Sequence, residues 1–263
     1  MFLAQPPSPW LADSVALVWF ARGATSPTKR EWVLPSGTAQ LLVNVAADRL
    51  TFHQRASETR NLAGVAVSGP FSRPLLVESS EQDDVCGVSF APGGLARFFG
   101  AIAHVMHNEM IDLSELRPDF DRSALDAVRA SDTDGRLDAL ERFVGSLVLA
   151  RPREPAVGWA VRELETPERR VRDLVAESGM SKRRFVNTFR QNVGLSPKQF
   201  QRVRRLRRAL HALERGTASA EAALAAGYYD QAHLIHEFQA LAGMSPATYI
   251  RRRSGYSGHA AVD

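Results

Sequence analysis

The sequence predicts a protein of the α+β class, with a small N-terminal β-barrel or sheet domain carrying helices and an all-α C-terminal domain of two helix-turn-helix units. Three observations predict this. Short apolar runs separated by Gly, Pro and Ser occupy residues 10–95. Apolar residues at helical spacing follow from about residue 95. A segment with glycine turns then appears twice within the last hundred residues.

Strand-like runs dominate the first part of the chain. Residues 40–45, 65–67 and 85–90 are apolar, and Gly, Pro and Ser separate them, which is typical of a small antiparallel sheet or barrel. Helical spacing then joins the following residues: Leu95, Phe98, Phe99 and Ile102, and later Leu137, Leu140, Val144 and Leu147. These later helices either form dimerisation surfaces or cover the barrel as lids.

The two copies of the repeat lie 49 residues apart. Phe185, Phe189, Gly194, Ser196 and Pro197 recur as Leu234, Phe238, Gly243, Ser245 and Pro246. In each copy a helix meets a glycine turn, at Gly179 or Gly227, and an N-cap, Ser181 or Asp230, opens a second helix. Two helices joined by a short turn with Gly are the helix-turn-helix signature, so the sequence predicts two DNA-reading units.

A long helix is predicted to join the two units. Ser196 precedes a proline at the first helical position, and apolar spacing continues until Gly216 ends the pattern. A rod of about 25 Å can hold two recognition helices near the ~34 Å repeat of successive major grooves. Two prolines and three charges mark residues 150–155 as a linker. We therefore expect a barrel domain at 1–150, a linker at 151–156, the double helix-turn-helix domain at 157–253 and a tail at 254–263.

Positive charge concentrates in the C-terminal part. Residues 157–253 contain 18 Lys or Arg against 9 Asp or Glu, whereas residues 1–156 contain 15 against 19. A basic segment beside a mildly acidic one indicates that the C-terminal part faces a polyanion. Sixteen of the 18 are arginines, which suit bidentate contacts with phosphate or guanine.

The first recognition helix has the stronger set of candidate DNA contacts. Arg183 and Asn187 are placed for base edges, guanine and adenine respectively. Lys182, Arg184 and Arg190 are expected to contact phosphates.

The second recognition helix has less positive charge. Gln231 and His236 are its expected contacts, and His233 either touches phosphate or packs near the helix start. We expect the second unit to bind more weakly.

The composition sets limits on other functions. The chain has no run of about 18 apolar residues, so no membrane span is expected, and residues 1–15 lack the pattern of an export signal. A single cysteine excludes an intrachain disulfide and fits a reducing compartment, so we expect the cytoplasm. No cofactor is predicted.

Two enzyme-like features have more ordinary interpretations. Cys86 lies in an apolar run with no basic or His-rich flank, so a buried inert thiol is favoured over an alkyl-transfer DNA-repair enzyme, the alternative function. His104, His107 and Glu109 could supply metal ligands, but polar surface or packing residues are the favoured interpretation, and no metal site is predicted.

Residues 155–253 resemble the arabinose-operon-regulator (AraC/XylS-type) family of bacterial transcription factors. The resemblance rests on the following residues: Gly179-Met-Ser181, Phe185, Phe189, Gly194-Leu-Ser-Pro197, Arg205, Ala209, Gly227-Tyr, Asp230, His233, Phe238, Gly243-Met-Ser-Pro246 and Tyr249. It implies two helix-turn-helix units bridged by a helix in each chain, bound to double-stranded DNA. Val186 stands where relatives often have a polar base-contacting residue, and His236 where they often have Arg. The resemblance therefore does not determine the target sequence, and it implies weaker binding by the second unit.

The N-terminal part resembles a subset of these regulators with an uncharacterised sensor domain, through residues 30–37, 67–70 and 87–94. The resemblance implies a barrel that binds a small-molecule effector or forms a homodimer. Trp10, Trp19 and Trp32 lie in this part, and we expect Trp32, beside two charged residues, at the mouth of a pocket.

Overall fold

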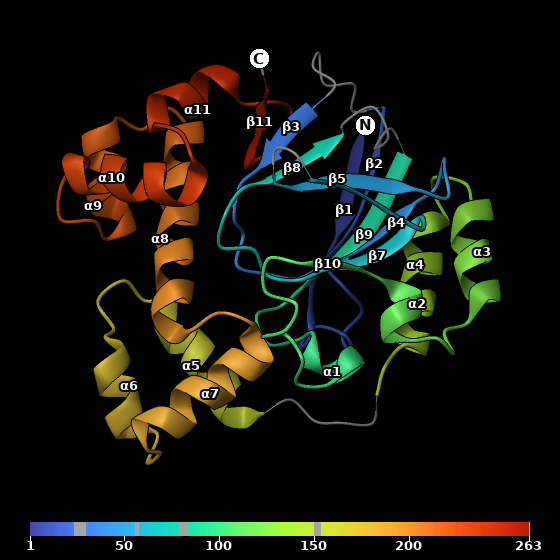
Figure 1. The fold of residues 1–263 in the computed structure, drawn as a ribbon, viewed down its shortest axis with the longest axis horizontal. Helices are drawn as coiled ribbons and strands as arrows, with labels where there is room; N and C mark the ends of the chain where they lie inside the picture. Colours follow the sequence, from blue (N-terminus) through green and yellow to red (C-terminus); the bar gives the residue numbers. More distant parts are fainter. Residues whose placement is uncertain (24–29, 56–57, 79–83, 150–153, 263) are drawn as a thin grey trace.

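The computed structural model describes residues 1–23, 30–55, 58–78, 84–149 and 154–262. Two facing sheets with short helices form the N-terminal region, and helices alone form most of the C-terminal region (Figure 1). This arrangement confirms the expected α+β class. Among the helices of these ranges, none is both long and apolar enough to cross a membrane.

The first sheet contains six strands of the described chain, in the order β1-β2-β9-β4-β7-β10, all antiparallel. Their bounds are β1 Phe2–Gln5, β2 Val15–Arg22, β4 Gln40–Asn44, β7 Val65–Ser68, β9 Asp84–Phe90 and β10 Met110–Asp112. Successive side chains point to opposite faces of a sheet. In β2, Val18 and Phe20 therefore enter a core under helices, while Trp19 points toward the second sheet.

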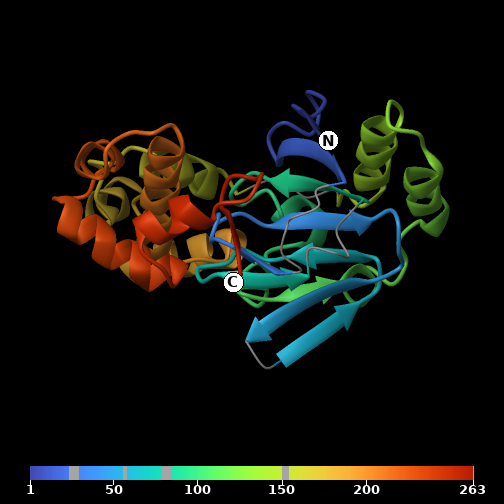
Figure 2. The same ribbon diagram turned by 90° about the horizontal axis from the view of Figure 1, so that it is seen from above.

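The second sheet has the order β11-β3-β8-β5-β6 within the described residues. Its strands are β3 Arg30–Val33, β5 Leu50–Arg55, β6 Glu58–Leu62, β8 Leu75–Glu78 and β11 His259–Ala261. β11 comes from the far end of the chain and lies beside β3 where the two regions meet (Figure 2). The last residues of the described chain are therefore part of the N-terminal fold.

Helices cover the outer face of the first sheet. Their bounds are α1 Ala96–Phe99, α2 Leu113–Leu116, α3 Arg122–Ala130 and α4 Arg136–Ser146. Phe143 of α4 is fully buried in one core with strand residues such as Phe20. These helices therefore act as lids on the sheet. The apolar pattern from Leu95 gives only one helical turn, because the chain turns at Gly100 with φ of 79°.

The C-terminal helices form two small cores along one rod. They are α5 Pro155–Leu164, α6 Val171–Glu177, α7 Lys182–Val193, α8 Pro197–Glu214, α9 Ser219–Ala226, α10 Gln231–Ala242 and α11 Pro246–Arg252. The first core joins α5, α6 and α7 to the start of α8, and the second joins α9, α10 and α11 to its end. At 1.5 Å per residue, the 18 residues of α8 span about 27 Å.

The expected domain boundaries remain proposals. The secondary structure differs from them at two places, the start of α5 and the C-terminal tail. Residues 151–153 of the expected linker lie outside the described residues, and α5 already begins at Pro155 rather than at residue 157, because proline fits the first turn of a helix. The expected tail, 254–263, contains β11. β11 pairs with the edge of β3 that is not bonded to β8.

Candidate nucleic-acid interface and ligand cavity

The first helix-turn-helix unit, α6 and α7, is built by its turn and cap. Gly179 has φ of +65°, a left-handed conformation that favours glycine. The Ser181 hydroxyl accepts a hydrogen bond from the amide of Arg184 at 3.3 Å, which satisfies one free amide of the first turn of α7. Phe185 and Phe189 are buried, with ring centroids 6.4 Å apart. This anchoring fixes which face of α7 remains open.

The second unit, α9 and α10, repeats this construction. Gly227 has φ of +86°, and the Asp230 carboxylate accepts from the amide of His233 at 2.7 Å. Leu234 and Phe238 are fully buried in the second core. The repeat detected in the sequence is therefore a repeat of structure. We call α6–α7 the first reader and α9–α10 the second reader.

All the candidate contacts of α7 lie on its open face. The exposed residues are Lys182, Arg183, Arg184, Asn187 and Arg190. Within the described residues, none of these side chains makes a hydrogen bond or an ion pair, so their charges and polar groups are free for a partner. Arg190 lies in the last turn, toward the N-terminal domain. Burial and the nearby charges of Arg190 and Arg73 lower the pKa of His107.

The second reader presents fewer groups. Gln231 and His236 are exposed and make no side-chain hydrogen bond to any described residue. His233 contacts two tyrosines at the start of α10. Its ring lies 5.2 Å from the ring of Tyr228, and its Nδ1 accepts from the amide of Tyr229 at 3.3 Å. Tyr229 itself is 86% exposed, an apolar group that the sequence pattern did not single out.

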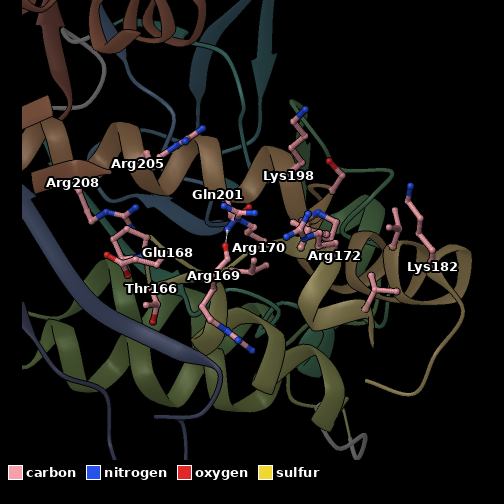
Figure 3. Close-up of a pocket in the computed structure, with 17 residues that line it drawn as sticks. Thr166, Glu168, Arg169, Arg170, Arg172, Lys182, Lys198, Gln201, Arg205 and Arg208 are labelled. Atoms are coloured by element: carbon pink, nitrogen blue, oxygen red, sulfur yellow. Dashed lines mark hydrogen bonds between the residues drawn. The ribbon is translucent and has the colours of Figure 1, made fainter. Parts of the chain in front are cut away.

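A basic groove of about 770 Å³ lies between α6, the start of α7 and α8 (Figure 3). The cationic residues that line it are Arg169, Arg170, Arg172, Lys182, Lys198, Arg205 and Arg208. Arg170 and Lys198 are exposed, and their side chains make no hydrogen bond or ion pair among the described residues. They stand beside Lys182, so the positive surface of the first reader extends beyond its recognition helix. The sequence analysis did not identify this extension, because its residues lie outside the recognition helix: Arg170 directly precedes α6, and Lys198 belongs to α8.

Other arginines of α8 hold the second reader and the end of α5 in place. Two guanidinium nitrogens of Arg202 donate to the Glu237 carboxylate of α10, both at 2.9 Å. Arg204 donates to Glu165 at 2.9 Å and 3.0 Å. Arg208 donates to the carbonyl of Ala226 at 3.2 Å. Part of the positive charge that the sequence analysis attributes to DNA binding therefore fixes the second reader and the end of α5 to α8.

The facing sheets of the N-terminal domain enclose a second hollow, a cavity of about 450 Å³. Trp19, Phe52 and Phe71 are among its lining residues. The expectation that Trp32 lines its mouth is wrong. Trp32 packs against the second core, because Glu31 takes the position on β3 that faces the cavity and side chains alternate along a strand.

The enzyme-like features have no reactive geometry. Cys86 is fully buried in β9, and burial raises the pKa of its thiol to about 12. His107 Nε2 lies 2.8 Å from the Ser72 hydroxyl. Among the described residues, no three His, Cys, Asp or Glu side chains gather as metal ligands would.

Comparison with known proteins gives matches for both halves of the chain. Residues 174–252 match a family described as a helix-turn-helix domain, and residues 4–112 match a domain of unknown function (DUF6597). No curated protein matches. The fold is similar to wild-type ToxT from Vibrio cholerae strain SCE256 bound to an unsaturated fatty acid, with 12% identity over 100% of this chain and 98% of that one and a TM-score of 0.49. ToxT from Vibrio cholerae O395 has 8% identity over 97% of this chain and 99% of that one, with a TM-score of 0.49.

Proposed function

We propose that this DNA-binding transcription regulator is of the AraC/XylS type, and that its two readers enter successive major grooves on one face of a DNA duplex. The observation that supports this most is the free, exposed set of polar and cationic side chains on α7. An unpaired surface of arginines at the start of a recognition helix is suited to a polyanion with readable base edges. α8 supplies the spacing between the readers.

Base readout is assigned to the centre of the open face of α7. Arg183 and Asn187 lie one turn apart there, and both are exposed. Arginine binds guanine and asparagine binds adenine through paired hydrogen bonds in the major groove. On the second reader, His236 stands at the position equivalent to Asn187 and Gln231 at the position equivalent to Lys182, with less charge and fewer donors.

Phosphate contacts are assigned to the cations around α7. Lys182, Arg184 and Arg190 belong to the recognition helix, and Arg170 and Lys198 extend the same surface across the basic groove. Contacts of this kind fix the register of a protein on DNA without reading sequence. The first reader is therefore proposed to supply most of the binding free energy.

We further propose that the N-terminal domain binds a small-molecule effector in its cavity, in preference to serving as a homodimerisation domain. The cavity supports this choice. Its volume of about 450 Å³ lies within the usual range for small-molecule sites, and aromatic side chains such as Trp19 and Phe52 line it. Cytoplasmic location is part of the proposal, because the regulated DNA lies there.

Selection of DNA from a random-sequence library by the full chain tests the DNA-binding proposal. An enriched motif with two half-sites is expected, and binding of the enriched site should weaken steeply with salt. Enrichment of no sequence would contradict it. The full chain is needed because β11 belongs to the N-terminal sheet.

A screen of small apolar and aromatic metabolites tests the effector proposal. At least one compound should raise the Tm of the full chain, change operator affinity and alter the fluorescence of Trp19, which lines the cavity. Trp19→Phe should remove the fluorescence response, whereas Trp32→Phe, on the opposite face of β3, should retain it. A response that Trp19→Phe leaves intact would place the ligand elsewhere.

A further inference from the structure

The C-terminal segment, residues 254–262, leaves the second reader and enters the N-terminal domain. β11 pairs antiparallel with β3, with Ala260 opposite Trp32. The amide of Leu34 donates to the carbonyl of Gly258 at 2.8 Å, and Ala260 is fully buried. The segment is thus a direct connection between α11 and the domain that encloses the cavity.

The same segment forms part of the cavity wall. Tyr256, Ser257 and His259 line the cavity together with strands of both sheets. The ring of Tyr256 lies 5.5 Å from the ring of Phe2 at the other end of the chain. Arg207 of α8 also lines the cavity. A molecule inside would therefore touch residues that belong to the DNA-binding half.

Glu214, the last residue of α8, joins this wall to the second reader. Its carboxylate accepts hydrogen bonds from the Tyr249 hydroxyl, from the Ser257 hydroxyl at 2.8 Å and from the amide of Gly258 at 3.2 Å. Tyr249 is fully buried, and its ring lies 5.9 Å from that of Phe238 in α10. One carboxylate thus contacts the cavity wall and the core of the second reader at once.

The turn before β11 requires glycine. Gly258 has φ of +80°, and a Cβ at this position would lie 2.3 Å from Nη1 of Arg207. Gly179, in the turn of the first reader, has a similar φ of +65°, a Cβ there would meet no atom within 4 Å, and the residue does not line the cavity. Gly258→Ala should therefore loosen the pairing of the segment with β3, and Gly179→Ala, which strains a turn outside the segment, is its control.

The chemistry of the cavity indicates its ligand. Among the described lining residues, the acidic and basic side chains are Glu31, Arg207 and His259. The Glu31 carboxylate lies 3.1 Å from Nδ1 of His259, and the negative charge of Glu214 attracts the guanidinium of Arg207. The other lining groups are apolar or aromatic, with a few hydroxyls and one amide. Because Glu31 faces His259, the charge of Glu214 offsets that of Arg207 and most of the other lining groups are apolar, the cavity suits a neutral, largely apolar molecule.

We propose that residues 254–262 are a ligand-responsive strap. A neutral, largely apolar molecule in the cavity packs against Tyr256, holds β11 on β3 and acts through Glu214 on the second reader. The proposal rests on the effector function proposed above. The coupling is reciprocal: the bound ligand favours the docked strap by the same factor by which docking of the strap tightens ligand binding. A substitution that undocks the strap therefore weakens ligand binding by that factor.

Hydrogen exchange and probe binding on the full chain test the strap without DNA. The probe is N-phenyl-1-naphthylamine, a neutral fluorophore, compared with 8-anilino-1-naphthalenesulfonate, which has the same rings and a negative charge. The neutral probe should bind more tightly and slow exchange in residues 254–262. Gly258→Ala should speed that exchange and weaken binding of the neutral probe, each by about tenfold or more, while Gly179→Ala changes neither.

Tyr256→Ala provides a second variant that leaves the backbone turn intact. It should weaken the neutral probe and abolish the slowing of exchange in the strap. Tighter binding of the anionic probe would overturn the ligand chemistry. Binding of the neutral probe with unchanged exchange in 254–262 would overturn the strap while leaving the effector cavity standing.

The link to DNA is tested by footprinting on the selected site. The neutral probe and Gly258→Ala should change protection of the second half-site in opposite directions and leave the first half-site unchanged. Equal changes at both half-sites would overturn the assignment to the second reader. Failure to select any DNA site is a separate result, which contradicts the DNA-binding proposal and not the exchange measurements.

Discussion

The carboxylate of Glu31 lies 3.1 Å from Nδ1 of His259, although 228 positions separate the two residues in the chain. This contact fastens the end of the DNA-binding half to the sheet that lines the cavity. The recognition helix of the first reader is also docked, since the amide of Ala103 donates to the carbonyl of Gln191 at 3.0 Å. Both readers therefore meet the N-terminal domain, and a change in that domain has two physical routes to the DNA-binding surface.

Replacement of Arg183 and of Arg190 should have different effects on DNA binding. Arg183→Ala should cost about 1–3 kcal/mol on the selected site and relax preference at one base position, because it removes a base contact. Arg190→Ala should weaken all sequences alike and reduce the salt slope by about one unit. Fluorescence anisotropy on selected and random DNA measures both. Equal losses on the two DNAs for both variants would contradict the assigned roles.

Lys198 tests the basic groove. Lys198→Ala should weaken binding to selected and random DNA equally and lower the salt slope by about one unit, because it removes one phosphate contact. Arg162→Ala is the matched control, since Arg162 is an exposed cation of α5 that does not line the groove. If both variants lose the same affinity, the groove has no special role beyond net charge.

Loss of the Arg202–Glu237 pair should destabilise the domain in a pH-dependent way. Burial raises the pKa of Glu237, but the hydrogen bonds and charge of Arg202 outweigh burial and hold it below its ordinary value. A lowered folded-state pKa gives stability that is present above the unfolded pKa and is lost as pH falls through the folded one. Because both side chains are partly exposed, Glu237→Gln should cost about 1–2 kcal/mol at pH 7.

Denaturant unfolding from pH 7 to pH 3 measures this difference. The gap between Glu237→Gln and the unaltered protein should shrink as the pH falls below about 4.3, the ordinary glutamate value. Glu221→Gln, at an exposed position of α9, is the control. A gap that does not change with pH would show that packing, rather than charge, accounts for the loss.

Cys86 should resist thiol reagents in the folded protein. Burial raises its thiol pKa to about 12, so almost none is thiolate at pH 8, and the side chain is fully buried. Labelling by a disulfide reagent should be slow in buffer and rapid in denaturant. Rapid stoichiometric labelling of the folded chain would contradict the inert role.

The sequence predicted the DNA-binding half in detail, because that half is built from local rules. Glycine turns such as Gly179 and side-chain caps such as Ser181 act within a few residues, and the structure places them as expected. Both readers were found through their repetition. The expected contacts on α7 are exposed together because Phe185 and Phe189 fix the helix orientation.

Long-range pairing could not be predicted in this way. The segment 254–262 has no strong strand pattern of its own, and β11 exists because an edge of β3 is available to it. The wrong prediction for Trp32 has the same origin. A change of one residue in the strand register would exchange the side chains on the two faces of β3. The internal roles of Arg202 and Arg204 were also hidden, because their partners lie 35 and 39 positions away.

Hydroxyl-radical footprinting of the full chain on its selected DNA tests the central claim most directly. Two protected segments about one helical turn apart on one face of the duplex are expected, with the first reader's segment protected more strongly. Arg183→Ala combined with Asn187→Ala should abolish protection of both segments, whereas Gln231→Ala combined with His236→Ala should weaken mainly one. A single protected segment, or stronger dependence on Gln231 and His236, would contradict the account.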